Sequence, residues 1–183
     1  MPDDKTMSDA LYHISEKPNI ARFEPRPAPS PSSGAEGEMV WAIAGRLLHN
    51  YLLPRDCPRV TFYALPDSAP EDIERLMGQS AADHIVAIES GWYERACTTR
   101  LYCYELPPAT FTSYKDEGAG YYTSRETVLP LSMRPIDHPL CEMLERNVEL
   151  RSTPSLWPLR DAVVDSTLQF SIIRMRNARP REE

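Results

Sequence analysis

The sequence predicts an α+β fold, with two small mixed or antiparallel β-sheets around a cleft and a long helix near the C-terminus. The first observation is that about five to seven apolar runs have the length and composition of short strands. The second is that the predicted helices fall irregularly between these runs, whereas a doubly wound parallel sheet requires regular alternation. The third is the stretch 159–179, which contains neither proline nor glycine. We therefore expect one domain over residues 10–179, preceded by a disordered tail over residues 1–9.

The composition is that of a folded, acidic chain. Hydrophobic residues make up 42% of the 183 residues and charged residues 26%, which suffices for a core without disulfides or metal. The net charge of −7 disfavours non-specific nucleic-acid binding, although a local basic pocket for a small anion stays open. Neither a membrane-spanning apolar run nor a signal-peptide core is present, so we expect a cytoplasmic protein without a membrane partner. The oligomeric state is left open.

No spacing in the sequence points to a built-in metal or cofactor site. There is no Cys-x-x-Cys pair, and no two histidines lie three or four positions apart. Glycine loops for phosphate and the G-x-S-x-G nucleophile motif are also lacking. We expect reduced, mostly buried thiols and no metal. The cysteines and histidines are Cys57, Cys97, Cys103, Cys141, His13, His49, His84 and His138.

Prolines outnumber glycines by 18 to 7, which predicts many stiff connections. The first strand, expected at residues 11–14, is followed by a proline-rich loop over residues 18–37. The length of this loop indicates a functional role at the border of the cleft. We expect it to be ordered only where Phe23 or Arg26 is tied down.

Capping signals delimit two of the expected helices. Ser68 and Glu71 form a capping box for a helix that ends near Gly78. Ser155 can cap the last and longest helix, over residues 155–177, whose apolar stripe contains Leu159, Val163, Phe170 and Ile173. The other expected elements are strands at 39–43, 60–64, 84–88, 99–106 (half-buried), 121–124 and 127–131, an extended piece at 148–150, and helices at 46–53, 89–96 and 138–146.

His13 and Tyr51 are the first candidate ligand-binding residues. His13 and Ser15 lie two positions apart on a strand, so both side chains face the same side and can hydrogen-bond a ribose or an amide. The alternative is a structural histidine that donates to a backbone carbonyl. Tyr51 ends the first helix, with Arg55 and Asp56 behind it, and can stack on a flat ligand. The alternative is a tyrosine of the core.

A second candidate region follows the glycine turn at residues 118–120. The stretch from Tyr121 to Glu126 combines hydrogen-bond donors, aromatic rings and opposite charges, which is more than a strand edge needs. Arg125 and Glu126 are the charged members of this stretch. The alternative is a solvated ion pair that contributes little.

Together these features resemble the small bacterial ADP-ribosyltransferase-like fold. In that fold a first strand carries a histidine in an H-x-[ST] setting, which residues 11–15 match. A second strand leads to a helix that supplies an aromatic residue, for which Tyr51 is the counterpart. A late strand carries the catalytic acid before a V-x-x-P-like segment, which residues 126–130 resemble.

This resemblance implies NAD as a substrate, with no cofactor built in. His13 is expected to hydrogen-bond a ribose hydroxyl, the Ser15 region to hold the nicotinamide amide and Tyr51 to stack on the nicotinamide. Glu126 would orient the acceptor and stabilise the oxocarbenium-like state as the glycosidic bond breaks. A second alignment of the same strand places Tyr121 or Tyr122 at the acid position.

The chain also resembles an uncharacterised bacterial family of about this length, through residues 11–26, 40–58, 120–130 and 156–177. Three hypotheses therefore stand. The first is a transferase or hydrolase acting on NAD, which requires Glu126 to face the same cleft as His13. The second is a non-catalytic module that binds a nucleotide or small ligand through His13, Tyr51 and Arg125. The third is an interaction protein, which predicts no pocket joining His13 to Tyr122.

Overall fold

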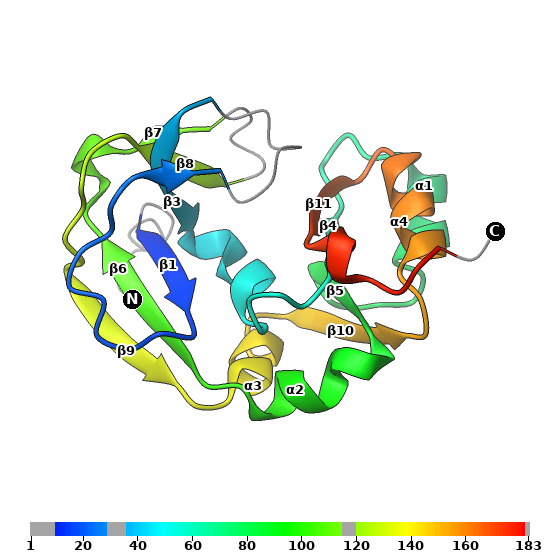
Figure 1. The fold of residues 1–183 in the computed structure, drawn as a ribbon. Coiled ribbons are helices and arrows are strands. Elements are labelled where there is room, and N and C mark those ends of the chain that lie inside the picture. The colour runs from blue at the N-terminus through cyan, green and yellow to red at the C-terminus, as the bar shows by residue number, and fades with distance from the viewer. Residues whose placement is uncertain (1–9, 29–35, 115–119, 182–183) are drawn as a thin grey trace, which may run out of the picture. The chain divides into compact units, whose positions relative to one another are not determined.

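The computed structural model describes residues 10–28, 36–114 and 120–181 and shows an α+β protein with two sheets (Figure 1), as predicted. The chain divides into two compact units. The first contains Met1–Leu48 and Leu101–Ile136, and the second contains His49–Arg100 and Asp137–Glu183. The tail predicted over residues 1–9 lies outside the described residues, and the single domain over residues 10–179 stays a prediction.

In the first unit the described residues form a seven-stranded antiparallel sheet. Its order is β7-β8-β3-β1-β6-β9, and β2 pairs with β3. The 3-10 helix η4 (Pro108–Thr110) lies between β6 and β7. The strands are β1 (Leu11–Ser15), β2 (Arg26–Pro27), β3 (Glu38–Ala44), β6 (Leu101–Leu106), β7 (Thr112–Ser113), β8 (Tyr121–Ser124) and β9 (Ser132–Ile136).

Strand β6 is buried on both faces, so the expectation of a half-buried strand is wrong. Leu101 and Cys103 point to one face and Tyr104 to the other, and all three are nearly inaccessible. Phe23 and Val128 belong to the core on the Tyr104 face. These two residues form an antiparallel bridge with reciprocal backbone hydrogen bonds of 2.8 and 2.9 Å. The loop before β3 therefore covers a face that alternation alone would leave to solvent.

The described part of the proline-rich loop is held at Phe23, which is buried, and at Arg26, which pairs with β3. The Tyr104 hydroxyl adds a third attachment. It donates to the Lys17 carbonyl at 2.7 Å and accepts from the Ile20 amide at 3.1 Å. One side chain of the sheet thus fixes the start of this loop.

Replacing Tyr104 with Phe should lower the free energy of unfolding by about 1–2 kcal/mol, because the loop loses two hydrogen bonds to a buried hydroxyl. Urea denaturation of the full chain measures this change. Tyr93→Phe is the matched control, since the Tyr93 ring is 50% exposed, and it should change the stability by less than about 0.5 kcal/mol. Equal effects of the two variants would contradict the attachment.

In the second unit the described residues form a four-stranded mixed sheet with the order β10-β5-β4-β11, in which only the β10–β5 pair is parallel. The 3-10 helix η2 (Gly45–Tyr51) leads into this unit. The strands are β4 (Arg59–Tyr63), β5 (His84–Glu89), β10 (Val148–Thr153) and β11 (Gln169–Ile173), and the helices are α1 (Pro70–Leu76), η3 (Ser90–Trp92), α2 (Tyr93–Thr98), α3 (Pro139–Leu144), α4 (Trp157–Val164) and η6 (Met175–Asn177).

The apolar core of the second unit lies on one face of its sheet. Val60 and Phe62 of β4 and Ile85 of β5 are at most 1% exposed and pack with Leu76 of α1 and Val163 of α4. At about 25 cal/mol for each Å² of apolar surface removed from water, such side chains contribute about 1.5–3 kcal/mol each. Helices α1 and α4 therefore cover this face.

The other face of β4 carries polar side chains, because successive residues of a strand point to opposite sides. Arg59, Thr61 and Tyr63 alternate with the core residues. Arg59 is 2% exposed and Thr61 is 4% exposed, so even these polar groups are covered. The Thr61 hydroxyl donates to the Ser171 carbonyl at 3.4 Å and the Arg59 guanidinium to the Arg55 carbonyl at 3.3 Å, as buried polar groups require.

The helix predicted over residues 155–177 is wrong. Helix α4 ends at Val164, and β11 then pairs with β4, with Phe170 opposite Phe62. The Asp72 carboxylate accepts from the Thr167 amide at 2.8 Å and from its hydroxyl at 2.9 Å, which holds the turn between α4 and β11. The stretch after this turn is rich in aromatic and β-branched residues, and pairing with β4 outweighs its helical pattern.

Two further expectations are corrected. A strand is expected at residues 127–131, but the strand in this region is β9, which begins at Ser132. Val128 forms only an isolated bridge with Phe23, and Pro130 interrupts further pairing. The predicted helix after residue 69 is present as α1, but Ser68 is not its cap. The Ser68 hydroxyl donates to the Thr167 carbonyl at 3.1 Å and accepts from the Leu65 amide at 2.9 Å.

No helix among the described residues is long and apolar enough to cross a membrane. The same residues contain no group of three or more histidine, cysteine, aspartate or glutamate side chains that could hold a metal ion. Of the thiols expected to be mostly buried, those of Cys57 and Cys103 are buried, whereas Cys97 and Cys141 are exposed.

Candidate functional site

His13 lies on the central strand β1 and points to the same face as Leu11 and Ser15. Its Nδ1 atom donates to the Trp41 carbonyl at 3.0 Å, and its ring centroid lies 4.7 Å from that of Phe23. A carbonyl accepts only, so Nδ1 carries the hydrogen of this bond. These are the contacts that the structural alternative describes.

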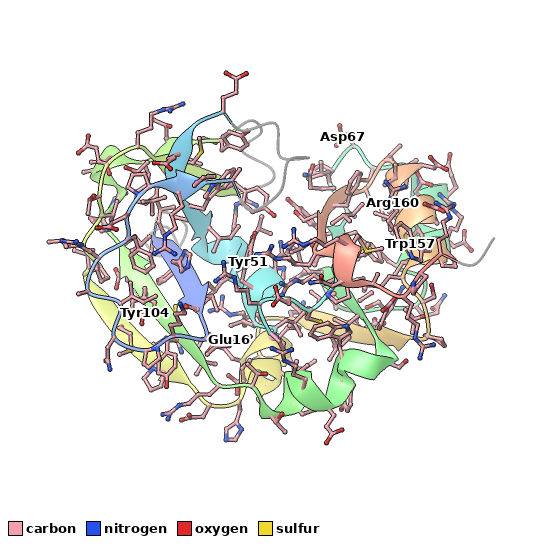
Figure 2. All side chains as sticks on the ribbon, in the orientation of Figure 1. Glu16, Tyr51, Asp67, Tyr104, Trp157 and Arg160 are labelled. Carbon is pink, nitrogen blue, oxygen red and sulfur yellow. The ribbon has the colours of Figure 1, made fainter. Side chains whose placement is uncertain are left out.

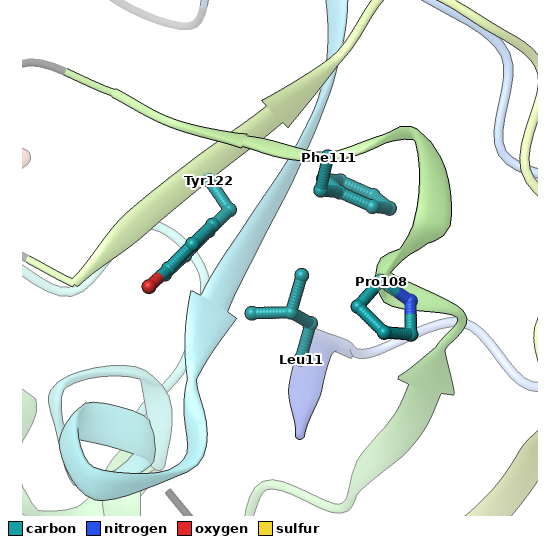
Figure 3. A pocket seen from close by; sticks show the side chains of 4 residues that line it. All are labelled: Leu11, Pro108, Phe111 and Tyr122. Atoms are coloured by element: carbon teal, nitrogen blue, oxygen red, sulfur yellow. The ribbon is translucent and has the colours of Figure 1, made fainter. Parts of the chain in front are cut away.

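Tyr122 lines a pocket of about 200 Å³ in the first unit (Figure 3). Figure 3 shows its ring with the side chains of Leu11, Pro108 and Phe111 around this space. The Tyr122 hydroxyl is the polar side-chain group of these four residues. The pocket therefore suits a small apolar group better than a charged one.

The pairing of the strands places His13 and Tyr122 on one face of the sheet. Leu11 pairs with Ala44 and Tyr122 with Ala42, and directly paired residues of antiparallel strands share a face. Strand β3 lies between β1 and β8, so the two side chains are two strand spacings, or about 10 Å, apart. The structure thus brings His13, with Ser15, and Tyr122 to the same layer without joining them.

Arg125 and Glu126 follow the end of β8 and are exposed. The Arg125 guanidinium donates to the Glu36 carbonyl at 3.3 Å. The Glu126 amide donates to the Ser124 hydroxyl at 3.2 Å, which forms a tight turn after the strand. Both side chains thus lie beyond the strand that carries Tyr122 rather than on its pocket face.

Tyr121, the second candidate for the acid position, points to the opposite face from Tyr122. The centroid of its ring lies 6.3 Å from that of the Trp41 ring. The centroid of the Tyr114 ring lies 4.9 Å from the same Trp41 centroid. These edge-on contacts are typical of aromatic packing. Tyr121 is therefore part of an aromatic group on the far face of β8.

Tyr51 belongs to the second unit, whereas the other five predicted site residues belong to the first. The guanidinium carbon of the buried Arg59 lies 5.8 Å from the centroid of the Tyr51 ring (Figure 2 labels Tyr51). Arg59 also donates to the Arg55 carbonyl at 3.3 Å. A cation over a ring face stabilises the pair by about 0.5–2 kcal/mol and fixes the orientation of both.

Arg174 follows β11 with left-handed backbone angles, φ 58° and ψ 27°, which are rare for a residue with a Cβ atom. Its pKa is lowered by burial, and then by the positive charges of Arg176 and Arg55. Asp56 and Tyr51 oppose this shift. Like charges that crowd a partly buried guanidinium raise its free energy, which is common where a protein holds an anion.

Four arginines form a group that we call the arginine cluster, because Arg59 lies over the Tyr51 ring and Arg55 and Arg176 act electrostatically on Arg174. Arg55 comes from the loop after η2, Arg59 begins β4, and Arg174 and Arg176 come from the turn after β11. The Asn177 side-chain amide donates to the Asp56 carbonyl at 2.8 Å and joins these two segments. The cluster consists of Arg55, Arg59, Arg174 and Arg176.

The sequence places Arg55 beside Tyr51 but does not indicate Arg59, Arg174 or Arg176. The helix expected over residues 155–177 contains Arg174 and Arg176 in its interior, where their spacing indicates no site. The alternation of arginines directly after an apolar, β-branched run was the available signal, because it fits the end of a strand. Pairing of Ile173 with Arg59 then brings the two arginine segments together.

Two buried polar side chains at the end of η2 have atoms without a hydrogen-bond partner among the described residues. They are the His49 Nε2 and the Asn50 Oδ1, in side chains that are 2% and 3% exposed. The His49 ring lies 4.4 Å from that of His84, which lies 4.5 Å from Tyr63. Burial, followed by the charges of His84 and Arg146, lowers the pKa of His49 to about 3, so this imidazole is neutral at physiological pH.

Comparison with known proteins relates the chain to one protein family. No curated protein matches the sequence, and no solved structure matches it. One family does match, over residues 12–178, which is more than nine-tenths of the chain. Its description is "Family of unknown function (DUF6886)", and this protein is a member of that family.

Proposed function

We propose that this protein binds a nucleotide and that the arginine cluster holds its phosphate. The observation that carries the proposal is that the charges of Arg55 and Arg176 act on Arg174, next to the Arg59–Tyr51 pair, in a chain whose net charge is −7. Asp56 is the carboxylate that acts on Arg174. In a chain with an excess of acidic residues, positive groups would not be expected to gather by chance. A bound anion would explain why these arginines lie together.

The guanidinium groups of the cluster repel one another. Burial lowers the pKa of Arg174, and the positive charges of Arg176 and Arg55 lower it further, whereas a phosphate between the groups would attract each of them. Guanidinium groups bind phosphate oxygens through paired hydrogen bonds that are about twice as strong as neutral ones. Arg174 has left-handed backbone angles, which cost conformational free energy in a residue with a Cβ atom. A role of its side chain in binding would explain why this cost is tolerated.

The ligand class follows from the ring beside the charges. Tyr51 is half-buried and is held by Arg59, so it offers a rigid aromatic surface next to the phosphate-binding groups. Aromatic surfaces beside arginines suit a nucleobase, with about 1–3 kcal/mol for each stacked base. A nucleotide therefore fits better than inorganic phosphate alone.

Replacing Arg174 with Asn should weaken binding of AMP or NAD by about tenfold or more, because a charge-assisted hydrogen bond to phosphate is lost. Asn tolerates left-handed backbone angles, so the turn should survive. Isothermal titration calorimetry with AMP, NAD, adenosine and inorganic phosphate measures the effect. Adenosine should bind more weakly than AMP in the unchanged chain.

The control is Arg75→Gln, which removes a guanidinium that is paired with Asp72 at 2.7 Å on the exposed side of α1. This variant should bind AMP as the unchanged chain does. Equal affinity of the Arg174 variant, or no binding of any phosphate compound at about millimolar concentration, would overturn the proposal.

A second candidate function is transfer of ADP-ribose from NAD, on an ADP-ribosyltransferase-like fold. The observation that favours it is that His13, which donates from Nδ1 to the Trp41 carbonyl, lies on the same face of the sheet as Tyr122. Tyr122 and Ser15 would contribute from the same face of the sheet, and Glu126 would stabilise the oxocarbenium-like state.

Release of nicotinamide from NAD by the purified chain tests this second function. His13→Ala and Glu126→Gln should each slow the release by at least about a hundredfold if they act as the resemblance implies. Arg22→Gln is a control, because Arg22 forms an exposed ion pair with Glu24 at 2.8 Å. Failure of the unchanged chain to release nicotinamide would exclude the transfer reaction and leave nucleotide binding as the function.

A further inference from the structure

The last described residues of the chain lie against the start of α4 in the second unit. The buried Glu89 accepts the Arg179 amide at 3.0 Å (Oε2) and 3.2 Å (Oε1). The indole Nε1 of Trp157 donates to the Arg179 carbonyl at 2.7 Å, directly before Pro180. The tail is therefore attached at the peptide group that precedes a proline.

Arg181 completes the attachment through its charge. Its guanidinium lies 5.6 Å from the centroid of the Trp157 ring and forms an ion pair with Asp161 at 2.5 Å. Figure 2 labels Trp157 and Arg160, and Arg160 also contacts the Asp161 carboxylate, at 3.0 Å. One carboxylate and one indole thus recognise the arginine that follows the proline.

The backbone of the tail has the geometry of a polyproline segment. Ala178 has φ −67° and ψ 160°, and the ring of Pro180 restricts its own φ to a similar value. Such segments present carbonyl groups at regular intervals without internal hydrogen bonds. Aromatic grooves that bind proline-rich peptides use these carbonyls and the proline rings.

Space remains beside the attached tail. A pocket of about 370 Å³ is bordered by the tail and by the start of α4. Proline rings form much of its wall, and Asp161 supplies a carboxylate. Apart from the tail itself, the residues that border this space and matter for recognition are Pro154, Trp157, Pro158 and Asp161.

We propose that this groove, formed by Trp157 and Asp161 with the neighbouring prolines, docks an extended segment of a partner protein in which an arginine follows a proline. The chain's own residues 179–181 occupy the groove in the same manner, and the partner segment replaces them. Charge complementarity with Asp161 and the indole donor of Trp157 select such a segment. The proposal does not depend on nucleotide binding by the arginine cluster.

The test uses the full chain with Arg181→Ala, which removes the tail's ion pair and leaves the exposed surface otherwise unchanged. The probe is a peptide with the sequence of residues 177–181 and blocked ends. We expect this peptide to shift the Trp157 indole resonance of the variant at sub-millimolar concentration, and to bind the unchanged chain at least about tenfold more weakly, because the attached tail competes.

Two controls make the outcome decisive. A peptide in which both arginines are replaced by glutamate should cause no shift, and adding Asp161→Asn to the variant should weaken binding by about tenfold. No shift with the arginine peptide at millimolar concentration, or equal shifts with the glutamate peptide, would overturn the proposal.

Discussion

Lowering the pH from about 7.5 to about 4.5 should remove about 2–3 kcal/mol of folding free energy through His49 alone. This imidazole is 2% exposed, and burial is the main reason that its pKa falls to about 3. His84 on β5 and Arg146 after α3 add positive charge that opposes protonation further. Native His49 therefore stays neutral over a pH range in which the unfolded chain takes up a proton.

The sign follows from the two pKa values. The folded value, about 3, lies below the ordinary value of 6.5, so the stability is complete above about pH 6.5 and is lost as the pH falls toward 3. Within this window the slope is about 1.4 kcal/mol for each pH unit. Urea denaturation at several pH values between about 7.5 and 4.5 measures the slope.

His49→Phe separates this effect from the titration of carboxylates. Phenylalanine keeps a ring beside His84 and has no proton to gain, and the His49 Nε2 atom that it removes has no hydrogen-bond partner among the described residues. The variant should lose about 2–3 kcal/mol less than the unchanged chain over the same pH range. Superimposable pH profiles would show that His49 does not carry the acid sensitivity.

The N-terminal two-thirds of the fold could be predicted because local patterns and tertiary contacts agree there. The run from residue 39 to 43 forms β3, and the alternating positions around residues 101–106 form β6. In the C-terminal third, the expected helix at 138–146 and extended piece at 148–150 correspond to α3 and β10, but β11 could not be predicted. A stretch without proline or glycine is compatible with a helix, but Phe170 and its neighbours form β11 because β4 offers a partner and Asp72 holds the turn before it.

The candidate site also contains some residues whose proximity the sequence indicates and others that only the fold brings together. Tyr51 and Arg55 are close in sequence, and their nearness could be inferred. Arg174 lies more than a hundred residues away and reaches them only because β11 pairs with β4, which no local pattern specifies. The His13 environment likewise depends on Phe23, whose position over the sheet follows from its bridge to Val128.

Replacing Glu89 with Ala should lower the free energy of unfolding by about 2–4 kcal/mol. Glu89 is 2% exposed, and its carboxylate accepts from the backbone amides of Leu156, at 3.3 Å, and Arg179. Alanine would leave the amide of the fully buried Leu156 without this acceptor, at a cost of about 1–3 kcal/mol, and would remove a charge-assisted hydrogen bond to the tail. Urea denaturation gives the total.

Amide hydrogen exchange distinguishes the two parts of this loss. Exchange at Arg179 should accelerate in Glu89→Ala, because the tail loses its anchor, whereas Glu89→Gln keeps one carbonyl oxygen and should show about half of both effects. Glu74→Ala, on the exposed side of α1, should change neither quantity by much. If the stability fell while Arg179 kept its protection, Glu89 would act on α4 alone, and the tail would be held by Trp157 and Asp161.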